Sequence, residues 1–99
     1  TPVAAVPAVA AARQATTLQA QADALAGDYR QALDSFAAAP VASDYVPALQ
    51  ELDDSARQIR AALMESPRST YLLQQLQRTY AQRLQLTREA TLSAARLTS

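Results

Sequence analysis

Four tyrosines are the side chains of this chain best suited to bind a ligand by stacking and hydrogen bonding: Tyr29, Tyr45, Tyr71 and Tyr80. Tyr29 and Tyr80 fall on apolar helical stripes, which predicts that they fill the core with their hydroxyls at its rim. Tyr45 and Tyr71 lie near expected helix starts and are predicted to pack against the loops. A small-ligand carrier formed by dimerisation would instead require a cavity near Tyr29 and Tyr80.

Few side chains in this sequence are suited to catalysis. The chain has no His and no Cys, so the usual zinc and haem ligands and the thiol nucleophile are absent. Asp53 and Asp54 are adjacent and face different directions on a helix, which favours a solvated outer face over an acid–base pair. Asp53 also has the i,i+4 spacing to Arg57 that is typical of an exposed ion pair. Because Ser, Thr and Tyr hydroxyls lack a base to activate them, we predict no enzymatic activity, no cofactor and no metal.

Arginines form a second set of candidate binding residues. Arg68, Arg78, Arg83 and Arg88 make the flank of the last expected helix basic, and we take them as a candidate interaction surface. Acids of the preceding helix could face them inside the protein, and an external acidic partner is the alternative. Nine basic residues balance nine acidic ones over the whole chain. This balance argues against non-specific nucleic-acid binding and against a polybasic helix on a membrane surface.

The elements that must position these residues are predicted to be helices. The first covers about residues 9 to 39, where Leu18, Leu25, Tyr29 and Phe36 belong to a stripe with steps of three and four residues. Gly27 inside it is expected to mark a close contact with another helix, with a kink as the alternative. Pro40 ends the helix.

A second helix follows a short connection and runs to about residue 64. Ser43 or Asp44 is predicted to cap it, and Pro47 falls in its first turn, where a missing N–H matters least. Pro67 breaks it, because the residue before a proline is pushed out of helical geometry. Ser66 or Ser69 then caps a third helix that runs to about residue 97. No segment alternates with a period of two, so no strand is predicted.

These elements predict an all-α fold: an up-down-up antiparallel bundle of three helices over residues 13–99, preceded by a linker or juxtamembrane stalk at residues 1–12. At 1.5 Å per residue the second helix covers roughly 30 Å and the others about 45 Å. The residues before Leu18 and from Arg88 to Ser99 therefore overhang opposite ends. The predicted core of the hairpin formed by helices two and three consists of Leu49, Leu52, Ile59, Leu63, Leu73, Leu76, Tyr80 and Leu84.

Alanine dominates the apolar residues and makes this core thin. Hydrophobic residues reach 49% of the chain, but 24 of the 99 positions are Ala. Oligomerisation would help such a core, so the bundle is a candidate dimer. No stretch approaches the 18 apolar residues of a membrane span. Because the chain begins at Thr1 without an initiator Met, any targeting or transmembrane segment is expected upstream.

The hairpin segment carries a family resemblance. "LDDSARQIRAALMESPRST" followed by "YLLQQLQRTYAQRLQLTREA" resembles the C-terminal, extracytoplasmic region of bacterial transmembrane zinc-finger anti-sigma factors. In that family a helix ending in an "I-x-x-L-R-x-A-L"-like run precedes a Pro turn and a helix with a Leu/Tyr stripe. The similarity extends over helices two and three as a whole, about 50 of the 99 residues. The positions that match are Ile59, Leu63, Pro67, Leu72, Leu73, Leu76, Tyr80, Leu84 and Leu86.

The resemblance implies a periplasmic sensing, dimerising or protease-protecting domain that is tethered upstream to the inner membrane. Such a domain would control sigma-factor release without enzymatic activity, with itself or another periplasmic protein as its partner. Direct sigma binding is not implied, because the zinc finger of that family needs Cys and His. The alternative function is a periplasmic helical adaptor or chaperone-like module, which would expose an apolar groove for unfolded clients. A tetratricopeptide pair is disfavoured, since no 34-residue repeat is present.

Overall fold

The computed structural model describes the backbone of residues 6–98 and the side chains of residues 17–97. Three α-helices, α1 (Val6–Asp34), α2 (Val46–Glu65) and α3 (Thr70–Thr98), form with one short 3₁₀ helix, η2 (Ser43–Tyr45). No strand occurs between residues 6 and 98, so the predicted all-α class is confirmed. The linker predicted at residues 1–12 lies in part outside the described residues, and α1 begins at Val6.

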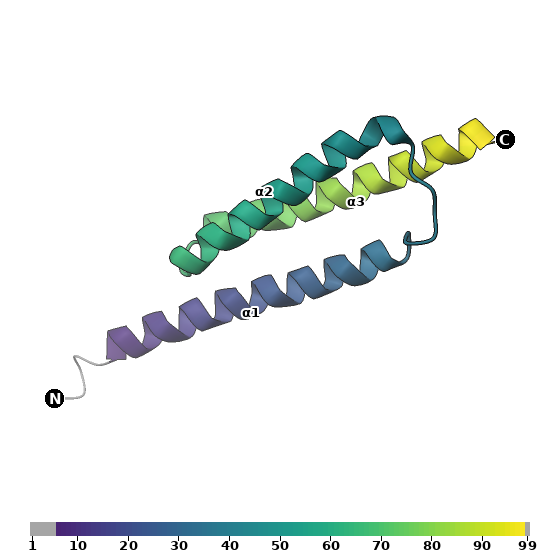
Figure 1. Ribbon diagram of the computed structural model, residues 1–99. Helices are drawn as coiled ribbons and strands as arrows, with labels where there is room; N and C mark the ends of the chain where they lie inside the picture. The colour runs from purple at the N-terminus through teal and green to yellow at the C-terminus, as the bar shows by residue number, and fades with distance from the viewer. Residues whose placement is uncertain (1–5, 99) are drawn as a thin grey trace.

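The three helices lie along one long axis (Figure 1). The chain runs out along α1, returns along α2 and runs out again along α3, and α2 and α3 lie side by side as a hairpin. The contacts between helices are consistent with the predicted up-down-up order. The first turns of α1 extend beyond the α2–α3 turn, and the last turns of α3 extend beyond the opposite end. The molecule is therefore long and narrow, with extents of 72 × 20 × 13 Å.

The C-terminal end of α1 comes earlier than the predicted residue 39. The α-helix stops at Asp34, and the backbone continues in tighter turns, with Phe36 N donating to Leu33 O and Ala39 N donating to Phe36 O. The Ser35 hydroxyl also donates to the carbonyl of Ala32, at 2.6 Å. Hydrogen bonds from i to i−3 commonly tighten the last turn of a helix, so residues 35–39 are coiled without being α-helical.

The first turns of α2 and α3 are capped differently. The predicted Ser43 or Asp44 cap of α2 is wrong: Tyr45 is the N-cap residue and no side chain caps the helix, because η2 already coils residues 43–45 ahead of it. Pro47 lies in the first turn of α2, as expected. At the start of α3, the Ser69 hydroxyl oxygen accepts from Leu72 N at 3.2 Å, so Ser69 is the capping residue of the two serines considered.

The core lies where all three helices meet. Leu63 from α2 and Leu73, Leu76 and Tyr80 from α3 are buried there against α1, and Leu76 is fully inaccessible to solvent. α1 contributes Leu18, Ala22 and Ala26 to this core, and Leu25 and Tyr29 are partly buried beside them. α1 therefore covers the large hairpin side chains with a mixture of Leu, Tyr and Ala side chains. Its two buried alanines let the helices approach closely but bury little area.

Gly27 does not mark a close helix contact, so that prediction is wrong. A Cβ atom placed on Gly27 would have no neighbouring atom within 4 Å, and its backbone is ordinary α-helix. A close approach occurs instead at Ala90 of α3, which is fully buried. There the N–H of Ala42, in the α1–α2 connection, donates to the carbonyl of Ala90 at 3.2 Å. This contact ties the connection to α3.

Candidate functional site: a polar cluster and an open groove

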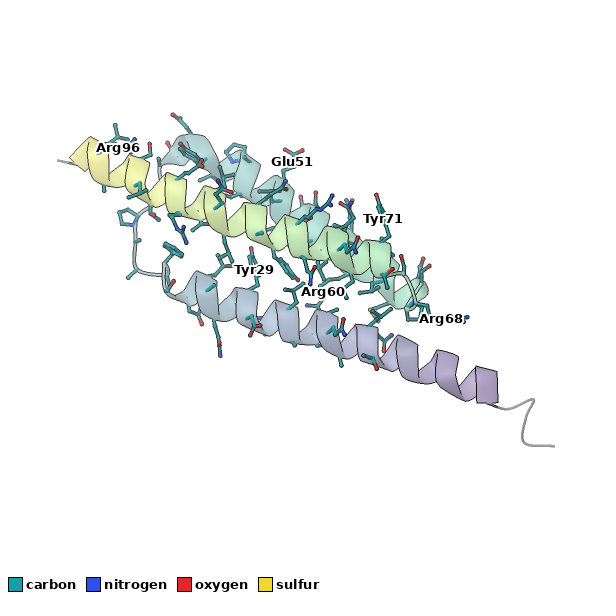
Figure 2. The ribbon with its side chains drawn as sticks, turned by 180° about the vertical axis from the view of Figure 1, so that it is seen from behind. Tyr29, Glu51, Arg60, Arg68, Tyr71 and Arg96 are labelled. Carbon is teal, nitrogen blue, oxygen red and sulfur yellow. The ribbon has the colours of Figure 1, made fainter. Side chains whose placement is uncertain are left out.

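The four candidate arginines do not form one surface. Arg68, Arg78 and Arg88 are exposed, whereas only 15% of the Arg83 side chain is accessible. Arg68 lies in the α2–α3 turn at one end of the bundle (Figure 2). Arg83 faces the bundle interior, where it pairs with an acid of α2. The structure thus separates Arg83 from the other three.

The predicted core of the hairpin divides by burial. Leu49, Leu63, Leu73, Leu76 and Tyr80 are buried, and Leu52, Ile59 and Leu84 are half-buried. Of the half-buried three, Ile59 packs against the buried core cluster. Buried alanines extend the seam of α3 beyond Leu84 to Ala90 and Ala94.

Asp53 of α2 holds together a polar cluster that reaches all three helices. Its Oδ1 accepts from Arg83 Nε at 2.9 Å and from the Tyr29 hydroxyl at 3.2 Å. Its Oδ2 lies 3.4 Å from Arg83 Nη2, so the guanidinium contacts both carboxylate oxygens. When two nitrogens of one guanidinium contact the same carboxylate, the pair gains geometric specificity as well as attraction. The cluster therefore fixes α1 and α3 relative to α2.

Thr87 is a further hydrogen-bond partner of Arg83. Arg83 Nη1 donates to Thr87 Oγ1, and the Thr87 hydroxyl donates to the Arg83 carbonyl at 2.8 Å. Within the described part of the chain, no buried side-chain nitrogen or oxygen lacks a hydrogen-bond partner. The cluster is thus satisfied as it stands and needs no ligand to complete it.

Tyr29 and Tyr80 stack on each other beside this cluster. Their ring centroids are 4.2 Å apart and their planes differ by 15°, and Figure 2 shows Tyr29 reaching from α1 towards the hairpin. Burial raises the pKa of the Tyr29 hydroxyl well above its ordinary value, and Asp53 adds to this rise while Arg83 opposes it. The two rings leave no space for a ligand between them, but both line an open hollow of about 230 Å³ on the surface of the bundle. A cavity near Tyr29 and Tyr80, which the carrier alternative requires, is therefore present.

The other two tyrosines differ from each other. Tyr45 is half-buried at the start of α2, but Tyr71 is 66% exposed at the start of α3. The prediction that Tyr71 packs against a loop is wrong. It stands on the outer surface of the hairpin (Figure 2).

The sequence interpretation of Asp53 is also wrong. We predicted a solvated Asp53 paired with Arg57, but Arg57 pairs with Asp54 on the outer surface, where both side chains are more than half exposed. The signal that the sequence interpretation missed is the spacing of these charges from the buried residues of their own helices. Asp53 lies four residues after Leu49 and three before Ala56, and Arg83 lies three after Tyr80 and four before Thr87. Each charge thus occupies a seam position on its own helix.

A line of three hollows follows α2; residues of α1 line the first two, and the third is lined by α2 residues alone. The first has a volume of about 300 Å³ and is lined by Gln19, Ala22, Asp23, Arg60, Leu63 and Met64. The second, of about 230 Å³, shares Arg60 with the first. The third, of about 330 Å³, shares Asp53 and Arg57 with the second and ends at Gln50. We call this line the α1–α2 groove, and Arg60 lies in it between α1 and the hairpin (Figure 2).

The groove contains both charge signs and some apolar surface. Asp23 and Arg60 lie across it, with Oδ1 and Nη2 3.2 Å apart. Ala22 and Leu63 are buried at its base, while Met64 at its edge is 75% exposed. Such a mixed surface offers both packing and ion pairing to another protein surface.

Neither metal binding nor membrane crossing is indicated by the described residues. They contain no group of three or more His, Cys, Asp and Glu placed to hold an ion. Among the helices described, none combines the length and apolar character required for a bilayer span. The polar cluster and the groove are therefore the candidate functional features of the described residues.

Comparison of the chain with family models, curated proteins and solved structures found no match. The class that the fold defines is an all-α helical domain.

Proposed function

We propose that this chain is a non-enzymatic interaction domain that associates with a second copy of itself. The observation that carries the proposal is its excess surface. The chain exposes 6857 Å², whereas a compact monomer of 10.6 kDa exposes roughly 5,500 Å². The excess of about 1,400 Å² is more than the roughly 800 Å² that each partner contributes to a standard interface.

The radius of gyration supports the same proposal. It is 17.9 Å over the Cα atoms, against about 13 Å for a compact domain of 100 residues. In this proposal the up-down-up bundle is half of a dimer, and the second copy supplies apolar contacts that the alanine-rich face of α1 does not. Dimerisation would thus add stability to a small domain with little buried area.

The proposed setting is the periplasmic regulatory part of a membrane-bound anti-sigma factor, tethered upstream. Its support is the Leu/Tyr stripe and Pro turn of residues 52–90, which resemble that family. In the proposed mechanism, packing of the α2–α3 hairpin controls access to a protease site nearer the membrane. The partner is a second copy or a periplasmic protein, and no nucleic acid takes part.

The mass of the protein in solution tests self-association. Sedimentation equilibrium or light scattering across micromolar to millimolar concentrations should show a rise from the 10.6 kDa monomer to twice that value. A mass that stays at one chain throughout this range contradicts the proposal.

A transcription reporter tests the regulatory setting separately. In the natural full-length chain, Leu76→Ala truncates the largest fully buried side chain among the described residues of the hairpin and should cost about 3 kcal/mol of folding free energy. We expect sigma-dependent transcription to change. Leu92→Ala is the matched control, because Leu92 is half exposed on the same helix. Unchanged transcription in a Leu76→Ala chain that has lost its helical signal would reject the anti-sigma setting while leaving self-association standing.

The adaptor or chaperone-like function is a second candidate, favoured by the exposed Met64 at the groove edge. Flexible Met side chains suit binding of varied apolar partners. This candidate expects the chain to suppress aggregation of an unfolded client, and Met64→Asp to weaken that suppression. The balanced charges that line the groove are less expected for a client-binding surface, so we place self-association first.

A further inference from the structure

The charges exposed at the middle of α2 are arranged so that a second copy of the same helix complements them. Asp54 and Arg57 lie one turn apart near the centre of α2, and their side chains are 58% and 71% exposed. Both line the third hollow of the groove, which α2 residues form alone, and Arg57 also lines the second hollow beside α1. An antiparallel copy of α2, related by a two-fold axis between Ser55 and Ala56, brings Asp54 of each helix opposite Arg57 of the other. In that register the numbers of any two facing residues have the same sum as 54 and 57.

We infer that the α1–α2 groove is the self-association surface, with the two α2 helices antiparallel across the two-fold axis and an alternating cluster of Asp54 and Arg57 side chains at its centre. This inference rests on the proposed self-association and names the surface that performs it. A two-fold interface must be self-complementary, because each residue meets its counterpart in exchanged roles. The central charges of α2 meet that requirement.

The remaining lining of the groove agrees with this occupant. Its charged residues are Asp23, Asp53 and Asp54 against Arg30, Arg57 and Arg60, three of each sign. A second copy therefore brings no net repulsion, whereas a strongly acidic or strongly basic partner would meet as many like charges as opposite ones. The hollows also leave room along α2 from Gln50 to Met64, roughly 20 Å of helix.

Apolar contact adds to this charge pattern. Met64 stands exposed at one end of the groove, and Ala26 and Ala56 lie at its base, where small side chains allow a helix to approach closely. Each copy has about 1,400 Å² of surface beyond that of a compact monomer of the same mass. A standard interface takes about 800 Å² from each partner, so one dimer contact is within this amount.

Two single charge reversals test the surface. In Asp54→Arg both central positions become basic, and in Arg57→Glu both become acidic, so each variant places like charges opposite each other in its own dimer. We expect the dissociation constant of each variant alone to rise at least about tenfold. An equimolar mixture restores opposite charges at both contacts, and we expect it to recover association near the wild-type strength.

Arg78→Glu is the matched control, because it reverses an exposed arginine on α3 outside the groove. It should associate as the wild type does. Sedimentation equilibrium measures the constants, and far-ultraviolet circular dichroism confirms that each variant is helical. If a reversal disturbs folding, Arg57→Gln and the salt dependence of wild-type association test the same charge contacts. Both the substitution and added salt should weaken the dimer.

The outcomes separate the two proposals. A wild-type dimer whose strength is unchanged by both reversals, or that the mixture fails to rescue, overturns the groove as the surface but leaves self-association intact. Weakening by Arg78→Glu to the same degree also overturns it, since the effect would then follow charge rather than position. A wild-type chain that stays monomeric overturns self-association and this inference together, and leaves the groove to a different partner.

Discussion

At the scale of single residues, the neighbouring acids Asp53 and Asp54 differ in environment and should differ in energetic effect. Asp53 accepts from Tyr29 and Arg83 at the helix contact, whereas Asp54 pairs with Arg57 on the surface. Replacing Asp53 with Ala should lower the free energy of unfolding by about 2 kcal/mol, because it leaves a largely buried guanidinium without its carboxylate. Asp54→Ala should cost about 0.5 kcal/mol or less.

Urea denaturation of both variants at one protein concentration measures the difference. Because the two substitutions remove the same chemical group from adjacent positions, a general effect of lost negative charge would appear in both. Equal losses of stability would contradict the environment described for Asp53.

Tyr29 should couple stability to alkaline pH. Its pKa is raised in the folded state, chiefly by burial, so the folded chain binds this proton more tightly than the unfolded chain. The contribution is fully present below the unfolded pKa of about 10 and is lost as the pH rises through the higher folded pKa. We expect the free energy of unfolding to fall above about pH 10.

Absorbance of tyrosinate during an alkaline titration measures this transition. Tyr29→Phe should remove the transition of highest midpoint and flatten the alkaline dependence of stability, while Tyr71→Phe, on an exposed ring, should leave both unchanged. Stability that falls equally in the Tyr29→Phe chain would show that another group controls it.

How much of the site the sequence could reveal is clear from Asp53 and Arg83. The apolar stripes predicted the hairpin residues, because hydrophobic periodicity records which face of a helix is covered. The same stripes contain two charges, and a reading based on hydrophobicity alone assigns charges to the solvent. Two opposite charges at seam positions of neighbouring helices are a pattern that sequence spacing can reveal. The Tyr29–Asp53 contact is different, because it depends on the relative height of α1 and α2, which no local pattern specifies.

At the scale of helices, α1 contains a position at which a single substitution should stabilise the protein. Gly27 lies in its interior, has helical backbone and has open space where a Cβ atom would be. Gly27→Ala should raise the free energy of unfolding by about 1 kcal/mol, since Gly is that much less favourable than Ala inside a helix. Ala24→Gly, on the exposed face of α1, should lower it by a similar amount.

Thermal unfolding followed by circular dichroism checks both changes. A destabilised Gly27→Ala chain would mean that another surface approaches α1 at that position, as a second copy could. The comparison is therefore best made at a concentration where the protein is monomeric, and repeated where it associates.

Helix ends were predicted less well than helix stripes, for a physical reason. Pro40 and Pro67 mark where α-helix cannot continue, but they do not specify how the chain coils before them. Residues 35–39 and 43–45 form tighter turns instead of α-helix. The Ala42–Ala90 contact that holds the connection in place is a tertiary interaction, so local sequence could not place these ends.

At the scale of the whole molecule, the staggered helices allow two modes of dimerisation, which give dimers of different shapes. A dimer across the α1–α2 groove places the molecules side by side, whereas a dimer through the overhanging ends of α1 or α3 places them end to end. The monomer is 72 Å long. The side-by-side dimer should keep nearly that maximum dimension while its width increases, because α2 lies in the middle part of the molecule (Figure 1).

Small-angle X-ray scattering distinguishes these shapes. At low concentration the radius of gyration should lie near the 17.9 Å of the chain, allowing for side chains and hydration. As the mass doubles, the cross-section should thicken with little increase in length. An end-to-end dimer would instead approach twice the 72 Å length, and that result would move the interface from the groove to the helix ends. In the Asp54→Arg variant the thickening should shift to higher concentration, because the lost charge contacts lie at the proposed dimer centre.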